Sequence, residues 1–246
     1  MNTITAIRRL ERPECTTLAV GEFERATELL TALEDGDWEQ STDCPDWDVR
    51  AVAGHVLGMA QTFSSLRELI TSMQAAGRTK GKRDFIDSLT DLQVRRNRDL
   101  ETSTLIAELG VVGPAAARWR ASHRLMRRLP LKNPTPDGGV ETWRMGYLFD
   151  VILLRDPWMH RVDISRAVGR PMVLTADHDG RIVADVVAEW AGRHGQPFTL
   201  RLTGPAGGNY VQGAGGPDLD LDAVEFCRIV SGRGQGDGLL TEFVPF

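Results

Sequence analysis

The stretch Asp46–Met73, DWDVRAVAGHVLGMAQTFSSLRELITSM, predicts one long helix that carries a histidine on its apolar side. Apolar residues recur along this stretch at alternating spacings of four and three residues, which is the pattern of a buried helical stripe. The stripe comprises Val52, Val56, Met59, Phe63, Leu66, Ile70 and Met73. His55 lies beside this stripe and is expected to point toward the interior. Asp48 is the expected N-cap, since a short carboxylate accepts from the free backbone N–H groups of a first turn.

A second pair of polar residues lies far along the chain, in RDPWMHRVD (residues 155–163). Asp156 and His160 are four residues apart, so a continuous helix would stack them on one face, about 6 Å apart. Together with His55 they offer one carboxylate, two imidazoles and an open coordination position. This set suits a catalytic Zn²⁺ or a similar divalent ion.

Two other interpretations of these residues stay open from spacing alone. A single histidine on an apolar stripe is often a hydrogen-bonded core residue, because neutral imidazole is frequently buried. Pro157 is most comfortable at the first position of a helix. Asp156 would then be the N-cap of a helix that runs to about Val168 and closes at Gly169. In that arrangement the Asp156 carboxylate faces its own backbone and not a metal.

Composition excludes several classes of function. A chain of 246 residues suits one large domain or, more naturally, two unequal ones, and 41% hydrophobic residues are enough for a real core. The net charge of −5 and the pI near 5.6 provide no attraction for nucleic acid or anionic membranes. There is no apolar signal-peptide core at the N-terminus and no uninterrupted run long enough to span a membrane. We therefore expect a soluble, cytoplasmic protein; the oligomeric state is left unknown.

The three cysteines are widely spaced and form no Cys-x-x-Cys pair, so neither a disulfide framework nor a cysteine-rich zinc site is indicated. We expect Cys15, Cys44 and Cys227 to be ordinary reduced thiols. Cys44 is the one cysteine near the expected site. A nucleophilic role for Cys44 is not favoured, because no residue next to it in the sequence would activate its thiol.

Four further helical patterns lie within residues 1–170, and together with Asp46–Met73 they predict an up-and-down four-helix bundle. They span Glu14–Glu34, Asp84–Leu109, Ala115–Leu129 and Thr142–Val168, and PLKNPTPDGG (residues 130–139) is predicted to be a loop. Residues 171–246 predict a small α+β domain. It would contain a helix over Asp179–Arg193, strands within residues 197–204 and 208–216, and a helix after Asp220 that Gly232 ends. The expected fold class is therefore α+β.

Three segments resemble the mycothiol-dependent maleylpyruvate isomerase family, part of the DinB-like group of four-helix metal proteins. CPDWDVRAVAGHVLGM (residues 44–59) resembles the segment that carries the family's helix-two histidine. RDPWMHRVDISRAVGRP (residues 155–171) looks like its second signature, in which an acid, a histidine and an aspartate precede Gly-Arg-Pro. DLDAVEFCRIVSGR (residues 220–233) resembles the closing segment of its sterol-carrier-like C-terminal domain. The likeness extends over nearly the whole chain.

The resemblance implies one divalent metal, usually taken as zinc, held by His55, Asp156 and His160. The acid at this position in the family is commonly glutamate; here it is the shorter aspartate, followed by proline. The resemblance also implies mycothiol as a thiol cosubstrate and a substrate-binding arginine in the C-terminal domain, for which Arg233 is the catalytic candidate. Secondary candidates are Arg50, Arg144 and Asp163, the last of which would orient His160 if a helical turn brings it within reach.

The reaction that the resemblance implies is a cis–trans isomerisation of a small-molecule substrate. It would proceed by thiolate addition to a double bond, rotation about the resulting single bond, and elimination of the thiolate. Two alternatives remain open. One is an S-transferase that leaves mycothiol attached to an electrophile. The other is a non-catalytic binding protein with a decayed metal site, whose C-terminal domain holds a small apolar ligand. The substrate itself depends on a pocket assembled from distant segments and is not identified by the sequence.

Overall fold

The computed structural model describes residues 2–79, 81, 84–135 and 138–246, which form two compact units. The helical unit is Arg12–Pro171, and the C-terminal unit combines residues 2–11 with Met172–Phe246. The sequence patterns predict that the helical domain includes the N-terminal residues, from residue 1 to residue 170. In the structure, strand β1 (Asn2–Thr3) instead pairs with Tyr210 and Val211 of the C-terminal unit.

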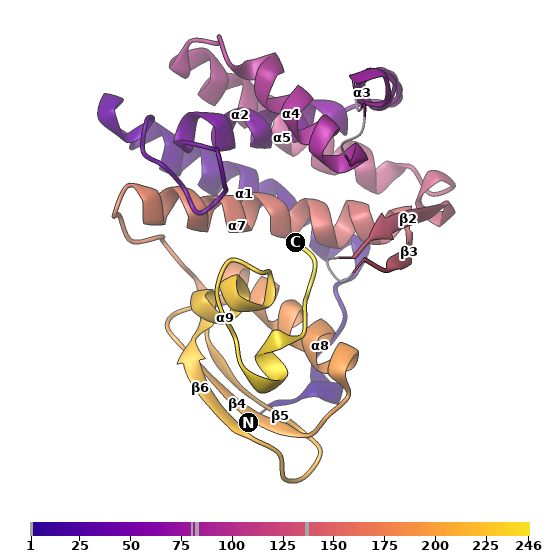
Figure 1. Ribbon diagram of the computed structural model, residues 1–246, viewed down its shortest axis with the longest axis vertical. Coiled ribbons are helices and arrows are strands. Elements are labelled where there is room, and N and C mark those ends of the chain that lie inside the picture. The colour runs from indigo at the N-terminus through magenta and orange to yellow at the C-terminus, as the bar shows by residue number, and fades with distance from the viewer. Residues whose placement is uncertain (1, 80, 82–83, 136–137) are drawn as a thin grey trace. The chain divides into compact units, whose positions relative to one another are not determined.

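Within its described residues, the helical unit is built around a ring of four helices (Figure 1). These are α1 (Arg12–Thr31), α2 (Val49–Thr62), α5 (Thr102–Ser122) and α7 (Leu153–Ala167). Helices α1 and α2 each pack against both α5 and α7, which closes the bundle, while α4 (Phe85–Asn97) packs on α2. The α+β class predicted from the sequence is confirmed.

Two glycines let helices of this bundle approach closely. A Cβ atom on Gly58 of α2 would lie 2.6 Å from the Cβ of Gln93 on α4. A Cβ on Gly113 of α5 would lie 2.4 Å from the ring of Phe23 on α1. Neither position has space for a larger side chain, because the interior is already packed at contact distance. The α2–α4 and α1–α5 interfaces therefore depend on glycine at these points.

The prediction of one helix over Asp46–Met73 is wrong, because the chain breaks after α2 and starts again as α3 (Leu66–Thr79). Ser65 caps the new helix, with its hydroxyl accepting the backbone N–H of Glu68 at 3.1 Å. SLRE (residues 65–68) carries the Ser-x-x-Glu capping signal in the sequence. As a result the apolar stripe does not stay buried: Leu66 and Ile70 are 49% and 46% exposed.

The predicted separation of one helix ending at Leu109 from another starting at Ala115 is also wrong, because α5 runs through both positions. The chain breaks between α4 and α5, and Pro114 lies buried inside α5. Asn97, the last residue of α4, is buried and donates its side-chain amide to the carbonyl of Gly54 at 2.8 Å. A proline removes one backbone hydrogen bond, and packing on both sides can hold a helix through that loss.

The predicted loop at residues 130–139 forms an antiparallel hairpin of β2 (Pro130–Pro134) and β3 (Val140–Arg144), and part of the loop, residues 136–137, lies outside the described residues. Pro130 and Pro134 occupy the two ends of β2, where they pair with Arg144 and Val140. Proline is tolerated at strand ends, so proline content alone was a misleading loop signal. The predicted helix Thr142–Val168 consequently starts later, at Met145.

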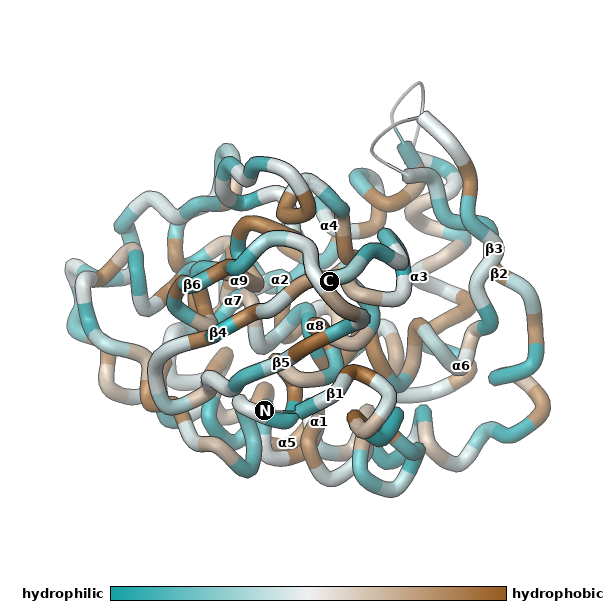
Figure 2. The backbone as a smooth tube through the Cα atoms, turned by 90° about the horizontal axis from the view of Figure 1, so that it is seen from below, coloured by the Kyte–Doolittle hydropathy of each residue, from teal (hydrophilic) through white to brown (hydrophobic). Residues whose placement is uncertain are grey.

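The C-terminal unit contains a mixed four-stranded sheet in the order β1-β5-β4-β6. Its further elements are α8 (Arg181–His194), β4 (Phe198–Thr203), β5 (Gly208–Gln212), β6 (Asp218–Asp222) and α9 (Ala223–Val230). Along β4 every second residue is buried, as expected for a strand with one covered face. Figure 2 shows hydrophobic and hydrophilic stretches alternating along this sheet.

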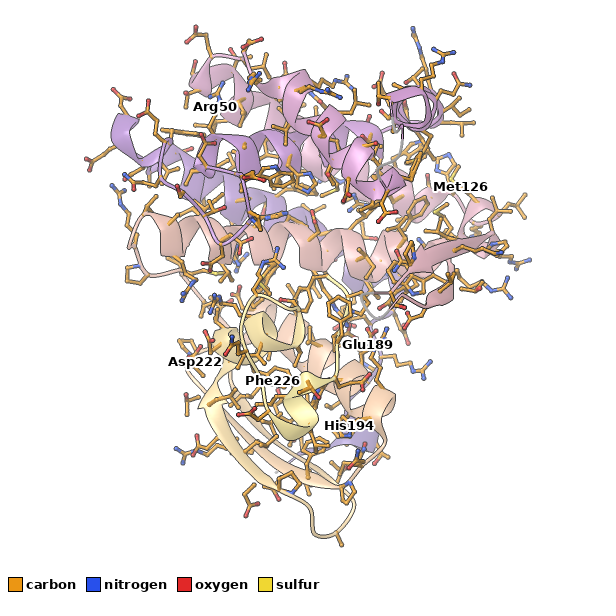
Figure 3. All side chains as sticks on the ribbon, in the orientation of Figure 1. Arg50, Met126, Glu189, His194, Asp222 and Phe226 are labelled. Carbon is orange, nitrogen blue, oxygen red and sulfur yellow. The ribbon has the colours of Figure 1, made fainter. Side chains whose placement is uncertain are left out.

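Aromatic rings form the core of the C-terminal unit. Trp190 of α8 lies 4.7 Å from Phe198 of β4 and 5.3 Å from Phe226 of α9, centroid to centroid, with the rings edge to face. Phe226 and His194 can be followed in Figure 3. These contacts join both helices to the sheet through one cluster. None of the described helices combines the length and hydrophobicity that a membrane span requires.

Candidate metal centre

Helix α2 holds His55 in the interior of the helical unit. The carboxylate of Asp48 accepts the backbone N–H of Ala51 at 2.7 Å, so the predicted N-cap is confirmed. His55 lies at the end of the second turn of this capped helix and is only 4% exposed. Its Nε2 lies 3.6 Å from Oδ1 of Asp156 on α7. The helix start therefore fixes the histidine that faces α7.

Helix α7 supplies the other two residues of the predicted set. The helical path is continuous from Met145 through α6 (Met145–Tyr147) and a π-helical turn (Leu148–Ile152) into α7. The alternative in which Asp156 caps a helix starting at Pro157 is wrong, because α7 begins at Leu153. Oδ1 of Asp156 lies 3.5 Å from Nε2 of His160, one turn further on. The predicted closure at Gly169 is confirmed, with φ of +64° at that residue.

The three side chains fit a single divalent ion. Their ligand atoms lie within 4.8 Å of one another, and both histidines present Nε2 to the same carboxylate oxygen. Ligand atoms about 2.05 Å from a tetrahedral Zn²⁺ lie roughly 3.3 Å apart, close to the 3.5 and 3.6 Å separations here. His55 Nδ1 and Asp156 Oδ2 are buried without hydrogen-bond partners among the described residues. Two imidazoles and one carboxylate are a donor set that zinc accepts.

The charges of this site support one another. Burial disfavours the charged form of Asp156, but the charges of His160 and His55 outweigh it and hold the pKa of the carboxyl well below its usual range. Burial also favours neutral His160, yet its pKa is raised well above 6.5 because Asp156 and Asp163 stabilise the imidazolium. A raised pKa means that a proton competes with a metal for the ring nitrogen of His160.

Asp163 and Cys44 contact the outer side of His160. Oδ2 of Asp163 lies 3.0 Å from Nδ1 of His160 and is fully buried, so the helical turn does bring the predicted orienting carboxylate within reach. The Cys44 thiol donates to the same oxygen at 3.3 Å. A carboxylate that accepts the Nδ1 proton leaves Nε2 free to face a metal, as in many zinc sites. Cys44 is thus a hydrogen-bond donor to the orienting group.

Trp47 belongs to the site, although the sequence analysis did not select it. Its ring centroid lies 5.0 Å from that of His55 and 6.3 Å from that of His160. The tight turn Cys44–Trp47 places it there, with Asp46 at a φ of 64°, a left-handed value uncommon for residues other than glycine. The Cys-Pro-x-Trp sequence was the available signal for this turn.

The predicted arginines lie in different surroundings. Arg50 donates to the hydroxyl of Thr102 at 3.1 Å and lies over the ring of Trp38, so it joins α2 to the start of α5. Its position is shown in Figure 3. Arg144 donates to the carbonyl of Arg128 beside the hairpin. Arg233 follows α9 in the C-terminal unit, where its carbonyl accepts from the guanidinium of Arg228. Its catalytic role stays a prediction.

Comparison with known proteins agrees with this architecture. Residues 20–165 match the family model described as the mycothiol maleylpyruvate isomerase N-terminal domain, and this range includes His55, Asp156 and His160. Two solved structures are similar over 95% of this chain and 93% of theirs. They are a mycothiol-dependent maleylpyruvate isomerase (18% identity, TM-score 0.55) and a mutant of that enzyme (17%, TM-score 0.54). No curated protein matches the chain.

Proposed function

The chain belongs to the mycothiol maleylpyruvate isomerase family, and we propose that it is a metal-dependent enzyme that uses mycothiol to act on a small unsaturated or electrophilic acid. One observation carries the proposal. His55 of α2 and Asp156 and His160 of α7 converge, with both Nε2 atoms 3.5 to 3.6 Å from one carboxylate oxygen. The family match supports the thiol cosubstrate, since the similar solved structures are those of a mycothiol-dependent enzyme.

The residues around the three ligands prepare the site for a thiol. A bound Zn²⁺ would supply a Lewis-acid position that favours thiolate over thiol. Asp156 offers an ionised oxygen to the ion. Asp163 holds the Nδ1 proton of His160, which keeps the Nε2 lone pair directed toward the site. The half-buried ring of Trp47 shields one side from water, which strengthens electrostatic interactions inside.

The proposed reaction is an isomerisation in which the cosubstrate is regenerated. The sulfur adds to a conjugated double bond, the former double bond rotates while it is single, and elimination restores the double bond and the thiolate. Arg233 is proposed to pair with a carboxylate of the substrate, because a guanidinium binds carboxylate in bidentate fashion. A transferase would share the addition step and retain the sulfur in its product.

The test uses untagged protein loaded with zinc, maleylpyruvate and mycothiol. Proton NMR follows the cis and trans isomers, and a thiol assay follows mycothiol in the same sample. We expect turnover that requires both zinc and mycothiol, with no net loss of thiol. Stoichiometric loss of thiol would instead identify an S-transferase.

His55→Ala and His160→Ala are the informative variants, and His123→Ala is the matched control. His123 is also a histidine of the helical unit, but its ring packs on Trp119 at 4.2 Å. We expect turnover to disappear in the first two variants and to persist in the control. Zinc-independent turnover, or equal activity in all three variants, would contradict the proposal.

A further inference from the structure

Pro157 leaves one backbone carbonyl of α7 without its usual donor. In an α-helix the carbonyl of Leu153 accepts the N–H of the residue four positions later, and proline has none. The proline ring also crowds that carbonyl. Leu153 has a ψ of 8°, far from the helical value near −42°, and its own N–H donates to Leu148 in the π-helical turn. The Leu153 carbonyl therefore lacks the donor that a regular α-helix would provide.

Arg120 of α5 supplies that donor. Its Nη2 donates to the Leu153 carbonyl at 3.3 Å, and the side chain is 1% exposed. The other guanidinium donors, Nε and Nη1, have no hydrogen-bond partner among the described residues. Burying a guanidinium in this way is costly, because unpaired buried donors forfeit their hydration. A residue retained at this cost is a candidate for a specific role.

The charge of Arg120 also lies close to the metal centre. Burial lowers the pKa of Arg120 to about 10, while Asp150 and Asp156 oppose the shift by stabilising its positive charge. The guanidinium thus remains charged at neutral pH. Asp156 follows Leu153 by less than one helical turn. The guanidinium that donates to the Leu153 carbonyl therefore also interacts electrostatically with the proposed metal-binding carboxylate.

We propose that Arg120 is a positioning residue for the metal centre: it pairs with the Leu153 carbonyl that Pro157 leaves open, and so holds the turn of α7 that carries Asp156 toward His55 and His160. This inference rests on the proposed function for its metal readout. It explains how Pro157 can follow a metal-binding acid directly. The proline leaves the carbonyl unpaired and widens the turn, and the arginine on the neighbouring helix restores a fixed geometry.

The test is a double-mutant cycle between Arg120 and Pro157, measured in two ways. Pro157→Ala returns the missing N–H, so that the helix can satisfy the Leu153 carbonyl by itself. The Tm of the metal-free protein tests whether the hydrogen bond to the Leu153 carbonyl stabilises the fold. The zinc affinity, measured by titration against a competing chelator, tests whether Asp156 is held in the position that binds the metal. The variants are Arg120→Met, Arg120→Lys, Pro157→Ala and the Arg120→Met, Pro157→Ala double variant.

We expect Arg120→Met to lower the Tm by about 5 °C, because a buried carbonyl loses a charged donor. We also expect it to weaken zinc binding about tenfold or more, in the range for residues that orient metal ligands. Arg120→Lys should recover part of the zinc affinity. In the Pro157→Ala background both losses should shrink by at least half, since the helix now supplies the donor.

Arg228→Met is the matched control, because Arg228 is also buried and also donates to a backbone carbonyl, that of Arg233. It should lower the Tm without changing zinc affinity. Equal Tm losses for Arg120→Met in both backgrounds would overturn the pairing with Leu153. Zinc affinity within twofold of wild type in Arg120→Met would overturn the positioning role. A wild-type protein that binds no zinc would overturn the proposed function, and the metal-free cycle would still decide the carbonyl pairing.

Discussion

The aromatic cluster of the C-terminal unit and the candidate metal centre of the helical unit are built from different kinds of side chain. The C-terminal unit is held by an aromatic cluster of Trp190, Phe198 and Phe226, all fully buried. The helical unit buries His55, His160 and the fully buried Asp163 among its apolar residues. Apolar burial stabilises a fold directly, whereas buried charges are costly unless they are paired or bind an ion. The difference suggests that stability and chemistry are separable in this protein, and each prediction below tests that separation.

The largest effect on stability is expected from Phe226→Ala. Deleting a fully buried phenylalanine typically costs 3–5 kcal/mol through lost burial and the cavity left behind. Urea unfolding should show this loss, while zinc stoichiometry of the folded protein stays as in wild type. A loss of zinc from folded Phe226→Ala would break the separation between the two interiors.

Asp163→Asn is expected to change the zinc affinity rather than the stability of the C-terminal unit. It removes the charge that holds the Nδ1 proton of His160, and we expect zinc binding to weaken about 10- to 100-fold. Zinc titration measures the change. The matched control is Asp43→Asn, which removes a carboxylate from a largely exposed pair with Arg166 and should leave affinity unchanged. Equal affinities in both variants would show that Asp163 does not orient a ligand.

The pH dependence of the metal-free protein sharpens the same comparison. The pKa of His160 is raised in the folded state, so its stabilising contribution is complete below pH 6.5 and is lost as pH rises through the folded pKa. The pKa of Asp156 is lowered in the folded state, so its stabilising contribution has the opposite pH dependence. The contribution is complete above the unfolded-state pKa of about 3.9 and is lost as pH falls toward the folded-state pKa. Zinc binding should instead strengthen as pH rises, since it displaces the His160 proton.

Urea unfolding of metal-free wild type at several pH values above 6.5, beside His160→Gln, measures this contribution. We expect the free energy of unfolding to fall with pH in wild type and to fall less in the variant. Identical pH profiles for the two proteins would show that His160 does not hold its proton unusually tightly.

The smallest effect is expected from Arg50→Ala. Arg50 binds Thr102 and lies over Trp38, away from the three ligand residues in its contacts. We expect a loss of about 0.5–1.5 kcal/mol in the free energy of unfolding, typical of one hydrogen bond, and unchanged zinc affinity. Weaker zinc binding in this variant would require a connection from the surface of α2 to the metal centre.

The residues of the candidate site were predictable from the sequence where helical spacing sufficed. The four-residue separation of Asp156 and His160 predicted their shared face, and the stripe around Val52 and Met59 predicted an inward His55. Trp47 and the contact of Cys44 with Asp163 were not predictable in this way. Those positions depend on a turn in the left-handed conformation and on packing between segments far apart in the sequence.

Three of the errors in the element boundaries involve proline. The sequence patterns place a helix start or a loop near positions 114, 130 and 157, whereas Pro114 and Pro157 lie inside helices and Pro130 lies at a strand end. The donor for the carbonyl left by Pro157 is Arg120, which lies on another helix. Such compensation is tertiary, so local propensity could not reveal it.

The most direct test of the account is the metal content of the untagged protein after zinc reconstitution, by elemental analysis of wild type, His55→Ala, His160→Ala and the control His123→Ala. The account predicts about one equivalent of zinc per chain in wild type and control, and little in the other two variants. Wild-type protein without metal, or zinc retained in both site variants, would contradict the assignment of His55, Asp156 and His160 as the metal centre.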